Sequence, residues 1–228
     1  MDNTKQGFED RKVEIENYFG YLKIFDNDDT KLQYKKEGED IIEKIQPQFQ
    51  IVLIANAFLI LYNLIESTIR NSIKEMYTKI NDDEVRYDGL SENLKKIWIK
   101  EITENLKEDS YKPETLLNYI FCLVKDILNE EKIMLSEENV SFSGNLDAEK
   151  IRDLAEQIGF GISPNGRNLV KIKERRNRLA HGEQTFSEVG RDFSVNELCD
   201  FKDETFKYLS DVINKIEIFI YDKKYTTN

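Results

Sequence analysis

One apolar run constrains the fold of this chain more than any other feature. Residues 51–65 read IVLIANAFLILYNLI, and every residue except Asn56 and Asn63 is apolar. The run is shorter than the roughly 20 apolar residues that a membrane-spanning helix needs, and the two asparagines interrupt it. It therefore predicts the buried centre of a long core helix over about 48–80, in a protein that does not span a membrane.

The rest of the chain also favours helices, because only 3 Pro and 10 Gly occur among 228 residues. The Ser194–Glu197 segment has the pattern of a capping box, which predicts a long C-terminal helix to about residue 222. Strand-like alternation is not evident. Apolar periodicity predicts further helices over about 8–24, 91–107, 113–130 and 146–158, and one that ends before Gly182. The expected fold is all-α, a helical bundle.

The length fits one domain over 1–228, with a helical N-terminal extension over about 1–47 and a core over about 48–222. The net charge of −11 disfavours a protein that coats nucleic acid, so any nucleic-acid role needs a local basic patch. The polar N-terminus lacks a signal-peptide pattern, and Cys122 and Cys199 stand alone. These features predict a cytoplasmic protein without a disulfide, a metal site or a cofactor.

A local basic stretch does surround His181, the single histidine of the chain. Between residues 167 and 178 the only acid is Glu174. The basic residues there are Arg167, Lys171, Lys173, Arg175, Arg176 and Arg178. Such a reversal of sign in an acidic protein favours an anionic ligand, and the alternative is a solvated helix face.

Arg176 has an unusual position within this stretch. Leu169, Ile172 and Leu179 form an apolar stripe at helical spacing, and Arg176 occupies the remaining place in it. A cation in an apolar seam is costly unless a carboxylate or a phosphate meets it. Either Arg176 pairs with a buried acid, or it waits for a phosphate ligand.

His181 is expected in the last turn of this helix, with Asn177 one turn earlier on the same side. Asn177 can hydrogen-bond the imidazole and fix its tautomer, which suits proton transfer. The alternative is that His181 only caps the helix, where the helix dipole favours its charged form.

The segment from Arg176 to His181 resembles the Arg-x4–6-His signature of the HEPN superfamily. Two further blocks, NAFLILYNLIESTIRNSI (56–73) and SGNLDAEKIR (143–152), are similar to the MAE-type HEPN branch. The resemblance implies a HEPN-like helical bundle that dimerises and brings two such motifs together. It also implies a metal-independent endoribonuclease of the kind found among toxins and antiviral effectors, with a possible antitoxin partner. Some members have lost activity and act as binding modules.

The predicted long helix adds a polar stripe of Asn56, Asn63, Glu66 and Arg70. Glu66 is the best candidate to pair with Arg176 or to orient the site, because polar groups in so apolar a helix need partners. The alternative is that the stripe is simply the solvent face of the helix. The residues expected to bind RNA are Asn63, Arg70, Lys173, Arg175 and Arg178.

These residues predict cleavage of RNA by attack of the ribose 2′-OH on its own phosphate. His181 would transfer protons and Arg176 would stabilise the charged phosphorane, with Asn177 and Glu66 completing the catalytic set. The expected products are a 2′,3′-cyclic phosphate and a 5′-OH. The main alternative is a non-catalytic interaction or RNA-binding module that regulates a partner protein. A DNA-binding regulator is disfavoured by the acidic exposed face of 146–158.

Overall fold

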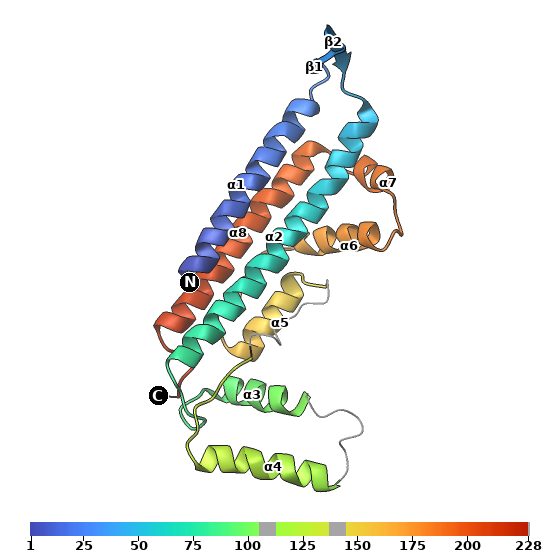
Figure 1. Ribbon diagram of the computed structural model, residues 1–228. Helices are drawn as coiled ribbons and strands as arrows, with labels where there is room; N and C mark the ends of the chain where they lie inside the picture. The colour runs from blue at the N-terminus through green and yellow to red at the C-terminus, as the bar shows by residue number, and fades with distance from the viewer. Residues whose placement is uncertain (105–112, 137–144, 228) are drawn as a thin grey trace.

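Three long helices form the centre of the protein. The computed structural model describes residues 1–104, 113–136 and 145–227. Within it, α1 (Asp2–Phe25), α2 (Pro47–Asp82) and α8 (Val195–Tyr221) lie side by side and contact one another in all pairs (Figure 1). The buried residues of α1 include Phe8, Ile15 and Leu22, which recur at every seventh position. The N-terminal helix is therefore part of the bundle core.

The predicted long core helix is confirmed as α2, which begins with Pro47 at its first position. It is apolar around most of its circumference because α1, α6, α7 and α8 all pack on it. Among the described residues it is the one helix long and apolar enough to cross a membrane. Its place in the middle of a bundle is compatible with a soluble protein.

The expectation of an all-α chain misses one element. Residues Lys31–Lys36 (β1) and Glu39–Lys44 (β2) form an antiparallel hairpin that projects beyond the tip of the bundle (Figure 1). Its two-residue turn, Glu37 and Gly38, has φ of 53° and 91°, the conformation of a tight hairpin turn. Both strands lie almost entirely in solvent, so no alternation between an apolar and a polar face betrays them in the sequence.

The second half of the chain adds shorter helices against α2 and α8. These are α5 (Ala148–Ile158), α6 (Asn168–Ala180) and α7 (Phe186–Arg191). The predicted capping box is confirmed at Ser194, and Thr185 starts α7 with another. The apolar residues at helical spacing in α5 and α8 are buried: Ala148, Ile151, Ala155, Ile158, Leu198, Phe201, Leu209, Val212, Ile216 and Phe219.

Helix α7 lies unusually close to α2. A Cβ placed on Gly190 would fall 2.0 Å from the carbonyl oxygen of Ile51, which is well inside van der Waals contact. Only glycine therefore permits this approach. The contact fixes the loop that follows the basic helix against the central helix.

The remaining helices lie at the opposite end from the hairpin. They are α3 (Glu92–Glu104), which packs on α5, and α4 (Pro113–Leu128). They correspond to the helices predicted over 91–107 and 113–130, and residues 105–107 lie outside the described residues. Most of the irregular connection expected over 131–145 lies outside them as well.

Candidate functional site

The basic stretch forms helix α6, which packs against both α2 and α8. Its predicted inward stripe is confirmed, because Leu169, Ile172 and Leu179 are all buried. Arg176 is half-buried in the same seam. The helix therefore carries a guanidinium to the edge of the core, where it must find compensation.

An aromatic ring provides this compensation, together with a neighbouring amide. The Arg176 guanidinium carbon lies 4.5 Å from the centre of the Tyr62 ring of α2. Its Nη1 also donates a hydrogen bond of 3.0 Å to the side-chain oxygen of Asn177. Among the described residues no carboxylate forms an ion pair with Arg176. The expected pairing with Glu66 is wrong, because Glu66 accepts from Arg70 one turn further along α2.

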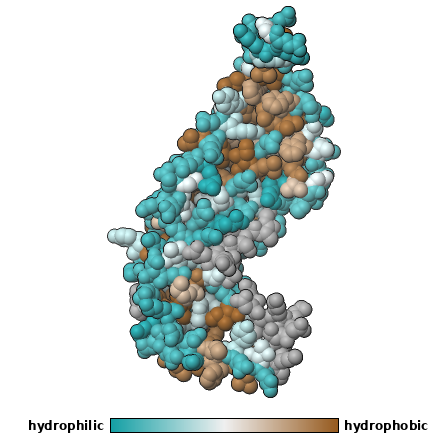
Figure 2. Space-filling view, in the orientation of Figure 1, coloured by the Kyte–Doolittle hydropathy of each residue, from teal (hydrophilic) through white to brown (hydrophobic). Residues whose placement is uncertain are grey.

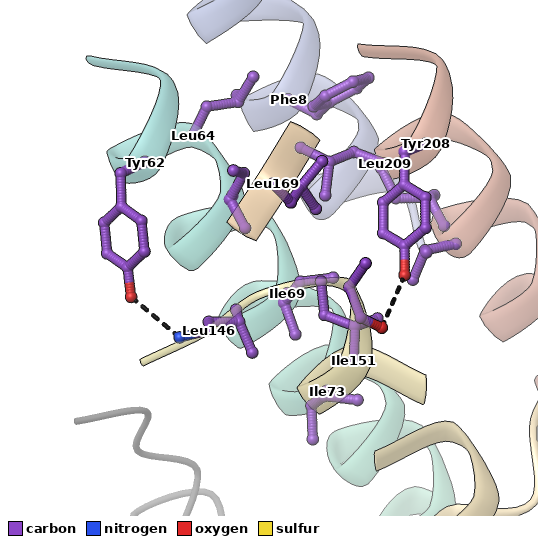
Figure 3. Close-up of a cluster of buried hydrophobic side chains, with 14 of the residues drawn as sticks. Phe8, Tyr62, Leu64, Ile69, Ile73, Leu146, Ile151, Leu169, Tyr208 and Leu209 are labelled. Carbon is purple, nitrogen blue, oxygen red and sulfur yellow. Dashed lines mark hydrogen bonds between the residues drawn. The ribbon is translucent and has the colours of Figure 1, made fainter. Parts of the chain in front are cut away.

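Tyr62 is the site residue that sequence reasoning missed. Its ring is fully buried, and its hydroxyl accepts a 3.1 Å hydrogen bond from the Leu146 backbone N–H (Figure 3). Burial raises the pKa of Tyr62, and the charge of Glu66 raises it further while that of Arg176 lowers it. The only available signal was its position, one helical turn before Glu66 on the face of α2 that meets α6.

His181 is the C-cap residue of α6, and its side chain is exposed. Its backbone N–H donates to the Asn177 carbonyl at 2.9 Å. The expected hydrogen bond from the Asn177 side chain to the imidazole is not formed. That side chain instead accepts from Arg176 and donates to the side-chain oxygen of Asn145 at 3.3 Å. Asn177 thus positions Arg176, and the ring of His181 faces solvent.

Lys173 differs from the other basic residues of α6 because it is a structural tie. Its ammonium pairs with Asp147, whose side chain is only 8% exposed and also caps α5 by accepting from the Lys150 N–H at 3.0 Å. Although burial opposes ionisation, these hydrogen bonds lower the pKa of Asp147. Lys173 therefore joins α6 to the start of α5, and the expectation that it contacts RNA loses its basis.

Two other cations flank the motif. Arg175 and Arg178 both donate to the side-chain oxygen of Gln184, at 3.2 and 3.3 Å. Arg175 also lies over the Phe193 ring and pairs with Asp192 at 3.5 Å. Arg178 is exposed and has no ion pair among the described residues, which leaves it the freer of the two to meet a phosphate.

The polar stripe of α2 completes the surroundings. Asn63 is exposed, and Arg70 is engaged by Glu66. Asn56 turns back to its own helix, donating to the Val52 carbonyl at 3.0 Å. Glu66 is the residue of this stripe that is linked to the motif, because its charge and that of Arg176 both influence the pKa of Tyr62.

The chain also matches a known protein family. The model of the MAE_28990-like HEPN family matches residues 1–225, almost the whole chain. The chain belongs to this HEPN family. Comparison with curated proteins found no match, and comparison with solved structures found none either.

Membership in the HEPN family points to a nuclease or RNA-related function in general. The matched range begins at residue 1, so it includes α1 and the hairpin as well as the motif helix. Within the described ranges 1–104, 113–136 and 145–227, no group of three or more His, Cys, Asp or Glu side chains is arranged to hold a metal ion. We assign the chemistry to the HEPN motif, Arg176 to His181.

Proposed function

We propose that this HEPN protein is a metal-independent endoribonuclease that acts in the cytoplasm. The observation that carries the proposal is that Arg176 is held in position but not neutralised. Its guanidinium is held by Tyr62 and Asn177, yet no carboxylate among the described residues neutralises it. A preorganised and unneutralised guanidinium is suited to bidentate contact with a phosphate.

The proposed reaction needs no metal, because the nucleophile is part of the substrate. The 2′-OH loses its proton to a base and its oxygen bonds to the adjacent phosphorus. The bond from phosphorus to the 5′-oxygen then breaks, and that oxygen takes a proton. The products are a 2′,3′-cyclic phosphate and a 5′-OH. His181 suits the proton transfers because histidine changes charge near neutral pH.

One imidazole per chain is awkward for two proton transfers, so we propose that two copies share the site. The central helix offers a surface for this pairing. Val52, Leu59 and Ile60 of α2 remain partly exposed, and exposed Asn63 follows them toward the motif. Figure 2 shows apolar side chains gathered in the upper part of the molecule, beneath the hairpin. A partly exposed apolar face beside a polar site suits a symmetric interface.

The decisive experiment compares wild-type protein with His181→Ala on single-stranded RNA and tRNA in EDTA. Wild type should cleave and leave 2′,3′-cyclic phosphate ends, whereas His181→Ala should not. Because His181 is exposed at a helix end, its replacement should leave the thermal melt unchanged. Equal cleavage by both proteins, or a strict need for a divalent metal, would contradict the mechanism. If wild type cleaves RNA, a toxin or antiviral role is tested by expressing the protein in cells with and without phage.

A second candidate function is a non-catalytic module that regulates a partner protein, and α4 favours it. Leu117, Phe121, Val124 and Leu128 follow one another at helical spacing, with exposed fractions of 68%, 67%, 44% and 74%. Such an apolar stripe is typical of a protein-binding surface. If wild type fails to cleave any RNA but captures a partner protein through this stripe, the second function replaces the first. A protein that cleaves RNA and also binds an antitoxin through this stripe would retain the first function.

A further inference from the structure

A second site lies at the other end of the motif helix. A cavity of about 700 Å³ opens between α5, the turn that precedes α6, and α8. Arg152 of α5, Arg167 at the N-cap of α6, and Lys207 and Tyr208 of α8 line it. Since α6 has 13 residues, the cavity and His181 are separated by roughly 20 Å along the helix.

The cavity and the Arg176 site are also separated by residues 146–151. Tyr62 and Tyr208 approach residues 146–151 from opposite sides, and their hydroxyls bond the backbone of Leu146 and Ala148 (Figure 3). Tyr62 supports Arg176, whereas Tyr208 lines the cavity. A ligand in the cavity therefore cannot be the phosphate that Arg176 would contact.

The charges of the three cations in the cavity are not neutralised by an ion pair with any described residue. Arg152, Arg167 and Lys207 form no ion pair or side-chain hydrogen bond with any described residue. The two acids that line the cavity contact neighbouring residues rather than these three cations. Asp203 pairs with Lys202 at 3.0 Å, and Glu204 binds both the backbone N–H and the side-chain amide of Asn168.

This arrangement is unusual in a chain of net charge −11, where acids to neutralise surface cations are plentiful. Three cations without an ion pair around one open cavity favour a ligand with several anionic oxygens.

We propose that this cavity binds a phosphate group through Arg152, Arg167 and Lys207. Two guanidinium groups can each make paired hydrogen bonds to phosphate oxygens, and the lysine adds a point charge. The phosphate comes either from the backbone of RNA or from a free nucleotide, which the volume also accommodates. Because binding is measured without cleavage, the proposal does not depend on the endoribonuclease activity.

The test uses the full chain and three probes that cannot be cut: pyrophosphate, ADP, and a fluorescent 2′-O-methyl RNA. Calorimetry measures binding of the first two at low ionic strength, and fluorescence anisotropy measures the RNA over a series of salt concentrations. The site variant is Arg152→Gln/Arg167→Gln/Lys207→Gln. The matched control is Lys31→Gln/Lys35→Gln/Lys36→Gln, which removes the same charge from the exposed hairpin. Thermal melts confirm that both variants are folded.

A free nucleotide as the ligand predicts that pyrophosphate or ADP binds the wild type and the control, and binds the site variant about 10-fold more weakly or worse. An RNA backbone as the ligand predicts that the salt dependence of RNA binding becomes shallower in the site variant alone, by about 0.7 per lost phosphate contact. If none of the three probes distinguishes the site variant from the control, the proposal is wrong.

Discussion

The guanidinium carbon of Arg176 lies 4.5 Å from the centre of the buried Tyr62 ring. This contact explains how a cation can occupy the apolar seam of α6 without an acidic partner. A cation–π contact of a half-buried guanidinium contributes about 1–2 kcal/mol, and Asn177 adds a hydrogen bond. The guanidinium is thereby held in place while its charge stays available to a ligand.

The two roles of Tyr62 can be separated by substitution. Tyr62→Phe keeps the ring under Arg176 but leaves the Leu146 N–H without its acceptor, which should cost about 1–3 kcal/mol of stability. RNA cleavage by the folded protein should stay near the wild-type rate. Tyr62→Leu removes the ring as well, so cleavage should fall while RNA is still bound. Denaturant unfolding and single-turnover cleavage measure the two effects, and equal cleavage by Phe and Leu variants would show that the ring does not position Arg176.

The sequence predicted every long helix, because apolar residues at helical spacing mark their buried faces, but it did not predict the six-residue α7. It also placed Arg176 correctly at the edge of the core, since its position in the stripe of α6 follows from spacing alone. The hairpin was missed because exposed strands have no buried face to impose alternation. The contact between Arg176 and Tyr62 was missed because it depends on how two helices far apart in the chain pack together. Tyr62 and Glu66 lie one helical turn apart on α2, and only the packing of the two helices decides which of them Arg176 contacts.

Removing the charge of Lys173 and removing that of Arg178 should have opposite effects on protein stability and on RNA binding. Lys173→Met leaves Asp147 unpaired in a site that is only 8% exposed, so stability should fall by about 1.5–3 kcal/mol while RNA affinity is maintained. Arg178→Gln removes an exposed cation, so stability should hold while the salt dependence of RNA binding becomes shallower. Thermal melts and binding isotherms at several salt concentrations measure both. A weaker salt dependence for Lys173→Met would restore its predicted role in RNA binding.

The lowered pKa of Asp147 gives this ion pair a defined pH dependence. A carboxyl whose pKa is lower in the folded than in the unfolded state stabilises the fold above its unfolded pKa, about 3.9. That contribution disappears as the pH falls through the lowered folded value. Asp147→Asn keeps a helix-capping oxygen but removes the charge. Its deficit in unfolding free energy should therefore be constant near neutral pH and shrink below about pH 4. A deficit that is the same at pH 7 and pH 3 would show that the charge of Asp147 is unimportant.

Gly190 tests the contact between α7 and α2. A methyl group at this position would overlap the Ile51 carbonyl, so Gly190→Ala must push α7 away from α2. We expect a loss of about 1–3 kcal/mol, the usual cost of overpacking. Gly20→Ala is the matched control, because a Cβ there meets nothing within 4 Å. In a helix it should be neutral or stabilising. Similar melting temperatures for the two variants would show that α7 moves without cost.

Substitutions of Arg176 distinguish a catalytic role from a structural role. If it were one half of a buried ion pair, Arg176→Ala would leave an unpaired acid and cost about 3–5 kcal/mol. The structure gives Arg176 an aromatic ring and an amide as partners, so the expected loss is only about 1–2 kcal/mol. Cleavage should fall by about 10²-fold or more, because a preorganised group that stabilises the phosphorane is gone.

Arg176→Lys should restore cleavage only in part, since an ammonium cannot make the paired contact of a guanidinium. A thermal melt and a cleavage assay on the same preparations measure both effects. If both variants melt far below wild type while their folded fraction cleaves RNA normally, Arg176 supports the fold and the catalytic assignment is wrong.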